Sequence, residues 1–249
     1  MPQKIKTKKL LVSGDSWMAS ESNWYEELFD SDQVTNLAVP GSGNKYIAES
    51  VMSHIIFKQD IDFVFVNWSG LVRIDIPMPL KVSNLGRSQE RTTANSKYWT
   101  NIVAPWRDKS QSIHIEEKIV RMMYQEKDYA NVKSQSLLNV INLQNFLKVK
   151  QIPYLFCFLY DYKNKDFDHN HLVAESQVDE HGWGVFSTLG SVEKDNPILA
   201  ELDRQFCLEP TGMDWGLRQS RDVFRDGIHL TKPMYREWAK EMLLNYQTK

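Results

Sequence analysis

Short apolar runs alternate with segments of helical periodicity along the first half of the chain. Runs of strand length occur at residues 10–13, 34–39 and 62–66, and the last of them holds a continuous apolar run after Asp62, as expected for a central strand buried on both faces. Between these runs, the four-residue spacing of apolar side chains predicts helices near residues 21–29 and around residues 47–55. This order of elements is typical of a parallel sheet covered by helices on both faces.

Two irregular stretches interrupt the alternation in the second half. Residues 71–131 contain three prolines and a middle rich in Arg, Ser, Thr and Asn, and they are too many for a plain connection. Residues 161–198 are rich in Asp, His, Asn and Gly, which predicts a surface loop with short helical pieces. A helix near residues 134–147 and a strand near residues 152–158 separate the two stretches. The stretch 71–131 is therefore interpreted as an insertion.

The chain closes with a predicted helix that follows residues 226–231. Thr231 can cap this helix, and Pro233 suits its first turn. One face of the helix carries an apolar stripe made of Met234, Tyr235, Trp238, Met242 and Leu243.

Composition and charge narrow the class of protein. The chain has 249 residues, of which 42% are hydrophobic and 25% charged, and this fits one α/β domain over residues 1–249 with the insertion inside it. With 30 basic and 32 acidic residues, the formal net charge is -2, so no general field attracts polyanions. We therefore expect neither nucleic acid nor a membrane surface as a partner.

Targeting and redox signals point to the cytoplasm. Four lysines among the first nine residues precede an apolar run of only three residues, which is too short for the core of a signal peptide. No stretch approaches the ~20 apolar residues that cross a bilayer. Cys157 and Cys207 lie in apolar surroundings without C-x-x-C spacing, so buried thiols in a reducing compartment are expected. The sequence thus predicts a soluble, cytoplasmic protein.

The first candidate for chemistry is a serine after the first strand. Ser16 follows Gly14 and Asp15 at a strand-to-helix turn, and ligands of open α/β sheets bind at this carboxyl edge. A serine here would also serve as a helix N-cap. A nucleophilic serine needs a base beside it, and Asp226 and His229 stand three residues apart before the last helix. Within such a turn the Asp226 carboxylate can orient His229, whose other ring nitrogen then takes the proton of Ser16.

These blocks resemble the GDSL/SGNH hydrolase superfamily, in the order of that family and across the whole chain. G-D-S lies near the amino terminus, Gly41 follows the second strand, and D-x-x-H precedes the last helix. The resemblance implies a three-layer, flavodoxin-like fold with a central parallel sheet, ester or thioester hydrolysis through an acyl-enzyme, and no metal or organic cofactor. The family's nucleophile, acid and base map on Ser16, Asp226 and His229. The main-chain N–H groups of Ser16 and Gly41 would point at the oxyanion.

The third block departs from the family's pattern. The family usually has G-x-N-D after the third strand, with an asparagine side chain that donates to the oxyanion, whereas this chain has Asn67-Trp68-Ser69-Gly70. Asn67 at the strand end and Asn44 beside the glycine block are the candidate replacements, and Ser69 is a further one. Two structural alternatives stay open: Asn67 can satisfy main-chain groups at the end of a buried strand, and Asn44 can cap the helix that starts there.

Four residues near the blocks are candidate substrate contacts: Asp15, Trp17, Trp68 and Arg73. An indole beside a guanidinium suits a sugar ring or a carboxylated substrate, and the alternative is a core tryptophan with a surface arginine. The insertion is expected to lie over the site, with Tyr98 and Trp99 in the pocket wall. The Asp- and His-rich run at residues 166–171 has a spacing that fits no familiar metal site.

Three functions follow as hypotheses. The leading one is an esterase that acts on a small-molecule or glycan ester, such as an O-acetyl ester, through an acyl-enzyme on Ser16. An acyltransferase would use the same acyl-enzyme, with a sugar hydroxyl in place of water. A non-catalytic binding or structural protein that keeps the fold is favoured by the altered third block.

Overall fold

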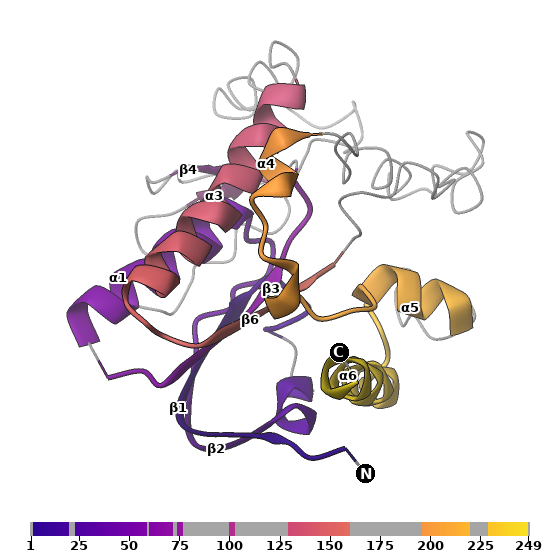
Figure 1. Ribbon diagram of the computed structural model, residues 1–249. Helices are drawn as coiled ribbons and strands as arrows, with labels where there is room; N and C mark the ends of the chain where they lie inside the picture. The colour runs from indigo at the N-terminus through magenta and orange to yellow at the C-terminus, as the bar shows by residue number, and fades with distance from the viewer. Residues whose placement is uncertain are drawn as a thin grey trace, which may run out of the picture.

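The computed structural model describes residues 2–19, 23–58, 60–71, 74–76, 100–102, 129–159, 196–219 and 229–248 (Figure 1). Arg73, Asp226, the pair Tyr98 and Trp99, and the run 166–171 lie outside these residues. What the sequence predicts for them therefore stays a prediction.

Four parallel strands form the central sheet: β1 (Ile5–Gly14), β2 (Phe29–Asn36), β3 (Phe63–Trp68) and β6 (Tyr154–Phe158). Their order in the sheet is β2-β1-β3-β6, which is the order in which flavodoxin-like sheets begin. In such a sheet the chain moves from β1 to one neighbour and then crosses to the other. The crevice for ligands lies where the direction reverses, at the carboxyl end of β1.

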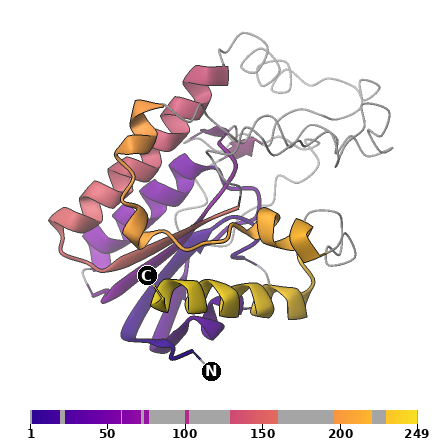
Figure 2. The ribbon, with the colours of Figure 1, turned by 45° about the vertical axis from the view of Figure 1, so that its right-hand side comes forward.

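Helices cover both faces of this sheet (Figure 2). On one face lie α1 (Asn44–Lys58) and α3 (Tyr129–Val149), which contact each other. On the other face lies α6 (Lys232–Gln247), which contacts the 3₁₀ turn η1 (Trp24–Glu27). This arrangement confirms the predicted three-layer α/β fold with a central parallel sheet.

Alternate residues of the inner strands fill two separate cores. Leu10 and Phe65 point into the core under α6, and Leu11 and Val64 point into the core under α1 and α3. All four side chains are at most 1% exposed, and each such buried apolar side chain contributes ~1.5–3 kcal/mol. The prediction that β3 is buried on both faces is confirmed.

The second strand starts earlier than the sequence predicts. Residues 21–29 were expected to form a helix and residues 34–39 a strand, but the described residues form only the 3₁₀ turn η1 before β2 begins at Phe29. β2 is an edge strand that pairs only with β1 among the described strands, and most of its residues are exposed or half-buried. Its polar run from Asp30 to Gln33 therefore lacks the apolar pattern that identifies a strand, and its pairing with β1 overrides local propensity.

The second half of the chain keeps the predicted helices. α3 contains the predicted segment 134–147 and is longer at both ends. Thr231 holds the N-cap position of α6 but makes no side-chain capping bond, while Pro233 lies in the first turn as predicted. Within the predicted insertion, β4 (Ile74–Ile76) and β5 (Thr100–Ile102) form an antiparallel pair that the sequence pattern did not indicate.

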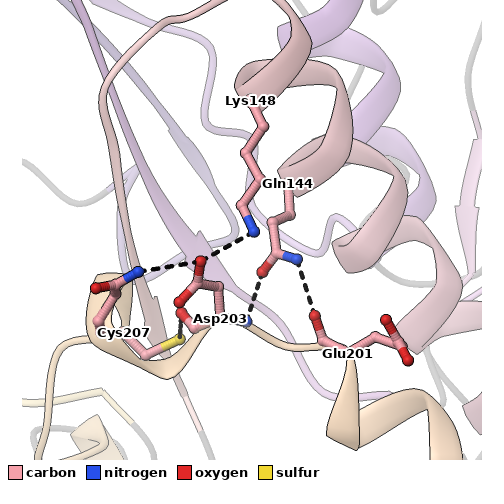
Figure 3. Close-up of polar contacts among 6 residues, drawn as sticks. Gln144, Lys148, Glu201, Asp203 and Cys207 are labelled. Carbon is pink, nitrogen blue, oxygen red and sulfur yellow. Dashed lines mark hydrogen bonds and ion pairs between the residues drawn. The ribbon is translucent and has the colours of Figure 1, made fainter.

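The segment after residue 195 is anchored to α3 (Figure 3). It contains α4 (Pro197–Ala200), the 3₁₀ turn η4 (Arg204–Phe206) and α5 (Gly212–Gln219). The Gln144 side chain donates to the carbonyl of Glu201 and accepts from the N–H of Asp203, at 2.9 and 2.7 Å. Lys148 forms an ion pair with Asp203 at 2.9 Å. These contacts hold the segment where Cys207 forms a parallel bridge to Phe156 of β6.

Both cysteines are buried thiols that form no disulfide, as the sequence predicted. Among the described helices, none is long and apolar enough to cross a membrane.

Candidate active site

Ser16 lies in a tight turn directly after β1. The turn is closed by the N–H groups of Met18 and Ala19, which both donate to the carbonyl of Asp15, at 3.1 and 2.9 Å. Gly14 precedes the turn, and a Cβ at this position would lie 2.8 Å from the carbonyl oxygen of Asn67. A glycine is therefore needed for β1 and β3 to approach each other this closely where the strand ends.

His229 lies beside Ser16 although 213 positions separate the two residues. Its Nε2 is 2.7 Å from Ser16 Oγ, and both residues are partly buried. His229 lies three residues before α6, and its ring centroid is 6.4 Å from that of Trp17. Asp226, the third member of the predicted triad, is outside the described residues.

Asp15 is not placed to contact substrate, which corrects one of the sequence predictions. Its side chain is fully buried, and its Oδ1 accepts from the Trp17 N–H at 3.0 Å. Its Oδ2 accepts from Ser69 Oγ at 3.1 Å. Asp15 therefore caps the turn that holds Ser16 and connects this turn to the loop after β3. The hydroxyl of Ser16 is bonded to His229 instead.

The prediction that Trp17 and Trp68 contact substrate is also corrected, because both are core residues at 0% exposure. Trp17 packs edge-on against Tyr235 and Trp238 of α6. Trp68 packs edge-on against Phe156 in the core under α1 and α3. A side chain enclosed in this way has no surface left for a sugar ring.

Asn44 is hydrogen-bonded to the loop after β3, which corrects the prediction that it donates to the oxyanion. Its Oδ1 accepts from the Ser69 N–H at 2.9 Å. Its Nδ2 donates to the Ser69 carbonyl at 3.3 Å and to Ser136 Oγ at 2.9 Å. An amide nitrogen carries two hydrogens, so both are used within the fold. Ser69 in turn gives its hydroxyl hydrogen to Asp15.

Asn67 has an amide nitrogen with no partner among the described residues. The side chain is 0% exposed, and its Oδ1 accepts from the Cys157 thiol at 3.2 Å. Burial raises the pKa of this thiol well above its usual value, with smaller contributions from Asp15 and Cys207, so the thiol stays protonated. Its Nδ2 is enclosed and makes no hydrogen bond. Buried polar groups of this kind are rare and costly, by ~1–3 kcal/mol.

The main-chain N–H groups of Ser16 and Gly41 have no hydrogen-bond partner in the described part of the chain. Gly41 adopts a φ of 81°, a conformation that favours glycine. The Val39 N–H donates to the Gly14 carbonyl at 3.1 Å. Since Gly41 and Ser16 each follow one member of this bonded pair by two residues, the two free N–H groups belong to neighbouring turns at the same edge of the sheet.

Three residues of this region carried no signal in the sequence. Ser136 bonds to Asn44, Cys157 bonds to Asn67, and Asp75 accepts from the backbone at the start of α1. Each acts across at least 29 positions of the chain, so no local motif identifies them.

A pocket of about 400 Å³ lies away from Ser16 and His229. It lies between α5, α6 and the chain that leads from α4 to α5, and Phe158 at the end of β6 also lines it. Its charged side chains carry both signs, among them Arg204, Arg218 and Asp214.

No family model matches the chain, and no curated protein matches it. Several solved structures are similar to this chain at low sequence identity. The YxiM protein of Bacillus subtilis matches 97% of this chain at a TM-score of 0.47 and 11% identity, and the chain spans 56% of that protein. The psychrotrophic esterase EstA from Pseudoalteromonas sp., inhibited by monoethylphosphonate, matches 98% of this chain and 100% of its own, at a TM-score of 0.45 and 10% identity. A member of the lipolytic G-D-S-L family from Veillonella parvula matches the same shares, at a TM-score of 0.42 and 11% identity.

Proposed function

We propose that this protein is a serine hydrolase of the GDSL/SGNH type that cleaves a carboxylic ester. The observation that carries the proposal is the 2.7 Å separation of His229 Nε2 and Ser16 Oγ at the carboxyl edge of the sheet. A general base must lie within hydrogen-bonding distance of the proton that it removes. The position of Ser16 after β1, where the strand order reverses, is also where open α/β sheets bind ligands.

The proposed reaction starts with attack by Ser16 Oγ on the ester carbonyl carbon, while its proton passes to His229 Nε2. The tetrahedral intermediate then expels the alcohol, which takes that proton from His229. Water, activated by the same nitrogen, hydrolyses the acyl-enzyme and restores Ser16. We assign Asp226 to the orientation of His229, because D-x-x-H places a carboxylate within one turn of the imidazole.

Two main-chain donors are proposed for the oxyanion. The N–H groups of Ser16 and Gly41 have no partner in the described residues, and an N–H that the fold leaves unpaired is ready to bind developing negative charge. Such donors act without reorganisation during the reaction, and the loss of one typically costs ~10²–10³ in rate. Asn67 is the side-chain candidate for a third donor, since its Nδ2 lacks a partner among the described residues. Its side chain is 0% exposed, so it must turn toward Ser16 to reach the oxyanion.

The substrate that we propose is a small-molecule or glycan ester with a short acyl group, such as an O-acetyl ester. Asp15, Trp17 and Trp68 are committed to the fold, so the pocket that selects the substrate must be built from other residues.

The test is labelling by a fluorophosphonate probe, which reacts with activated serines. The wild-type chain is expected to be labelled on Ser16, and the Ser16→Ala and His229→Ala variants are expected to lose labelling and hydrolysis of p-nitrophenyl acetate, because nucleophile and base act as a unit. Ser31→Ala is the matched control, since Ser31 lies on β2 and its hydroxyl bonds to the backbone carbonyls of Lys8 and Gln33. If Ser16→Ala is labelled as well as the wild type, or the folded wild type is not labelled, the proposal is wrong.

A further inference from the structure

The start of α1 is capped from a distant part of the chain. The residue before the helix is Gly43, which has no side chain with which to cap it. Instead, Oδ1 of Asp75 accepts from the Gly43 N–H at 2.9 Å, and Oδ2 accepts from the Tyr46 N–H at 2.8 Å. Asp75 belongs to β4 and is 6% exposed. A carboxylate at a helix N-terminus is favoured by both the unpaired N–H groups and the helix dipole.

The capped turn is continuous with the loop that carries Gly41. At one end of this loop the Val39 N–H is bonded to β1, and Ser42 donates its N–H and hydroxyl to the Val39 carbonyl, at 3.1 and 2.7 Å. At the other end Gly43 is held by Asp75. Gly41 lies between these fixed points, and its N–H direction depends on both of them. The carboxylate of Asp75 thus binds the main chain of Gly43, two residues after the proposed oxyanion donor Gly41.

We propose that Asp75 is a positioning residue, which holds the loop of Gly41 so that its N–H faces the oxyanion formed at Ser16. This inference rests on the proposed function and extends it, because it makes the β4–β5 pair part of the structure that supports catalysis. Asp75 does not touch the reacting atoms. Its effect passes through Gly43 to Gly41, and its loss should weaken transition-state stabilisation while leaving binding of the ground-state ester unchanged.

The experiment compares Asp75→Asn and Asp75→Ala with the wild-type chain, using kcat and KM for p-nitrophenyl acetate. A displaced Gly41 donor predicts a fall in kcat of ~10–100-fold, which is less than the complete loss of a donor costs. KM should stay within ~2-fold, because the interaction acts only in the transition state. The inhibition constant of an alkylboronic acid, which forms a tetrahedral adduct with an active-site serine, should rise by about the same factor as kcat falls.

The matched control is Asp203→Asn, which removes a partly buried carboxylate that also bonds to a neighbouring element, but at the α3 anchor. This variant should lose some thermal stability and keep the kcat and boronate affinity of the wild type. Comparison with this control therefore distinguishes a general loss of stability in the Asp75 variants from displacement of the Gly41 N–H. If Asp75→Ala does not fold, Asp75→Asn decides, since it keeps the size of the side chain and replaces one acceptor by a donor.

Unchanged kcat and boronate affinity in a folded Asp75 variant would overturn the inference and leave the proposed function standing. The failure of the proposed function itself has a different signature, in which the wild-type chain shows no hydrolysis that depends on Ser16.

Discussion

Asn67 and Asn44 are both buried asparagines near the proposed site, and they differ in what their amide nitrogens contact. Both hydrogens of Asn44 Nδ2 are donated to Ser69 and Ser136. Asn67 Nδ2 donates to nothing among the described residues, while the Cys157 thiol fixes its Oδ1 on the other side. A polar group left unpaired in a core is costly, and the exceptions in native proteins call for an explanation such as a catalytic role.

This difference predicts opposite effects for two alanine variants. Asn67→Ala should lower kcat on an acetyl ester by ~10²-fold if Nδ2 donates to the oxyanion, with little change in the free energy of unfolding because no strong bond is lost. Asn44→Ala should instead lower the free energy of unfolding by ~1–3 kcal/mol, since it removes the buried hydrogen bonds that Asn44 makes with the main chain of Ser69 and with Ser136. Steady-state kinetics and urea unfolding of both variants measure this, and a wild-type kcat for Asn67→Ala would leave the oxyanion with main-chain donors alone.

At this scale the sequence predicted residue types better than it predicted contacts. The blocks brought attention to Ser16 and His229, whose side chains meet at 2.7 Å. The blocks could not show that the amide of Asn44 would donate to Ser69, or that Trp17 and Trp68 would be buried in the core. Each of those outcomes depends on a partner from another element, so local sequence carries no trace of it.

Among the elements, the regular helices and inner strands were predictable because burial leaves a recognisable apolar pattern in their sequence. α1 carries buried apolar residues at helical spacing, and β3 contains a continuous apolar run. β2 does not, since an edge strand with exposed polar residues has one hydrogen-bonded neighbour and little burial to record. The β4–β5 pair was missed for a similar reason, because strands of three residues are too short to show alternation.

The contact between α3 and the segment that leads to α5 depends on charge, which makes it sensitive to pH. Burial acts to raise the pKa of the Asp203 carboxyl, but hydrogen bonds from Lys148 and Gln205 and the charge of Lys148 hold that pKa below its usual value. A carboxyl whose pKa is lower in the folded state stabilises the fold above its unfolded pKa of ~3.9. This stabilisation is lost as the pH falls through the folded-state pKa.

Asp203→Asn is therefore expected to lower the free energy of unfolding at neutral pH by at most ~1 kcal/mol, because Lys148 and Asp203 are both partly exposed. Urea unfolding of wild type and variant should show this difference near pH 7, and the difference should shrink as the pH falls through the lowered pKa of the folded-state carboxyl. Lys148→Met should behave in the same way. A difference that persists undiminished at low pH would contradict the role given to the ion pair.

Over the whole molecule, topology explains how one site draws on both ends of the chain. Ser16 follows the first strand, and His229 precedes the last helix. The strand order β2-β1-β3-β6 places β1 between its two neighbours, so the turns after β1, β2 and β3 meet at one edge. α6 packs on the sheet face next to β1 through Trp238 and Leu243, which brings His229 to the same edge. The sequence predicted the parallel sheet and the apolar stripe of the last helix, but the strand order that places β1 between its neighbours comes from the structure.

The central claim is that Ser16 becomes acylated during turnover, and trapping the acyl-enzyme tests it most directly. Wild-type protein mixed with p-nitrophenyl acetate and quenched in acid within the first turnover should carry one acetyl group, and peptide mass spectrometry should place it on Ser16. The released p-nitrophenol should show a burst of about one equivalent if deacylation limits the rate. Acetylation that is absent, that falls only on lysines, or that persists unchanged in Ser16→Ala would contradict the claim.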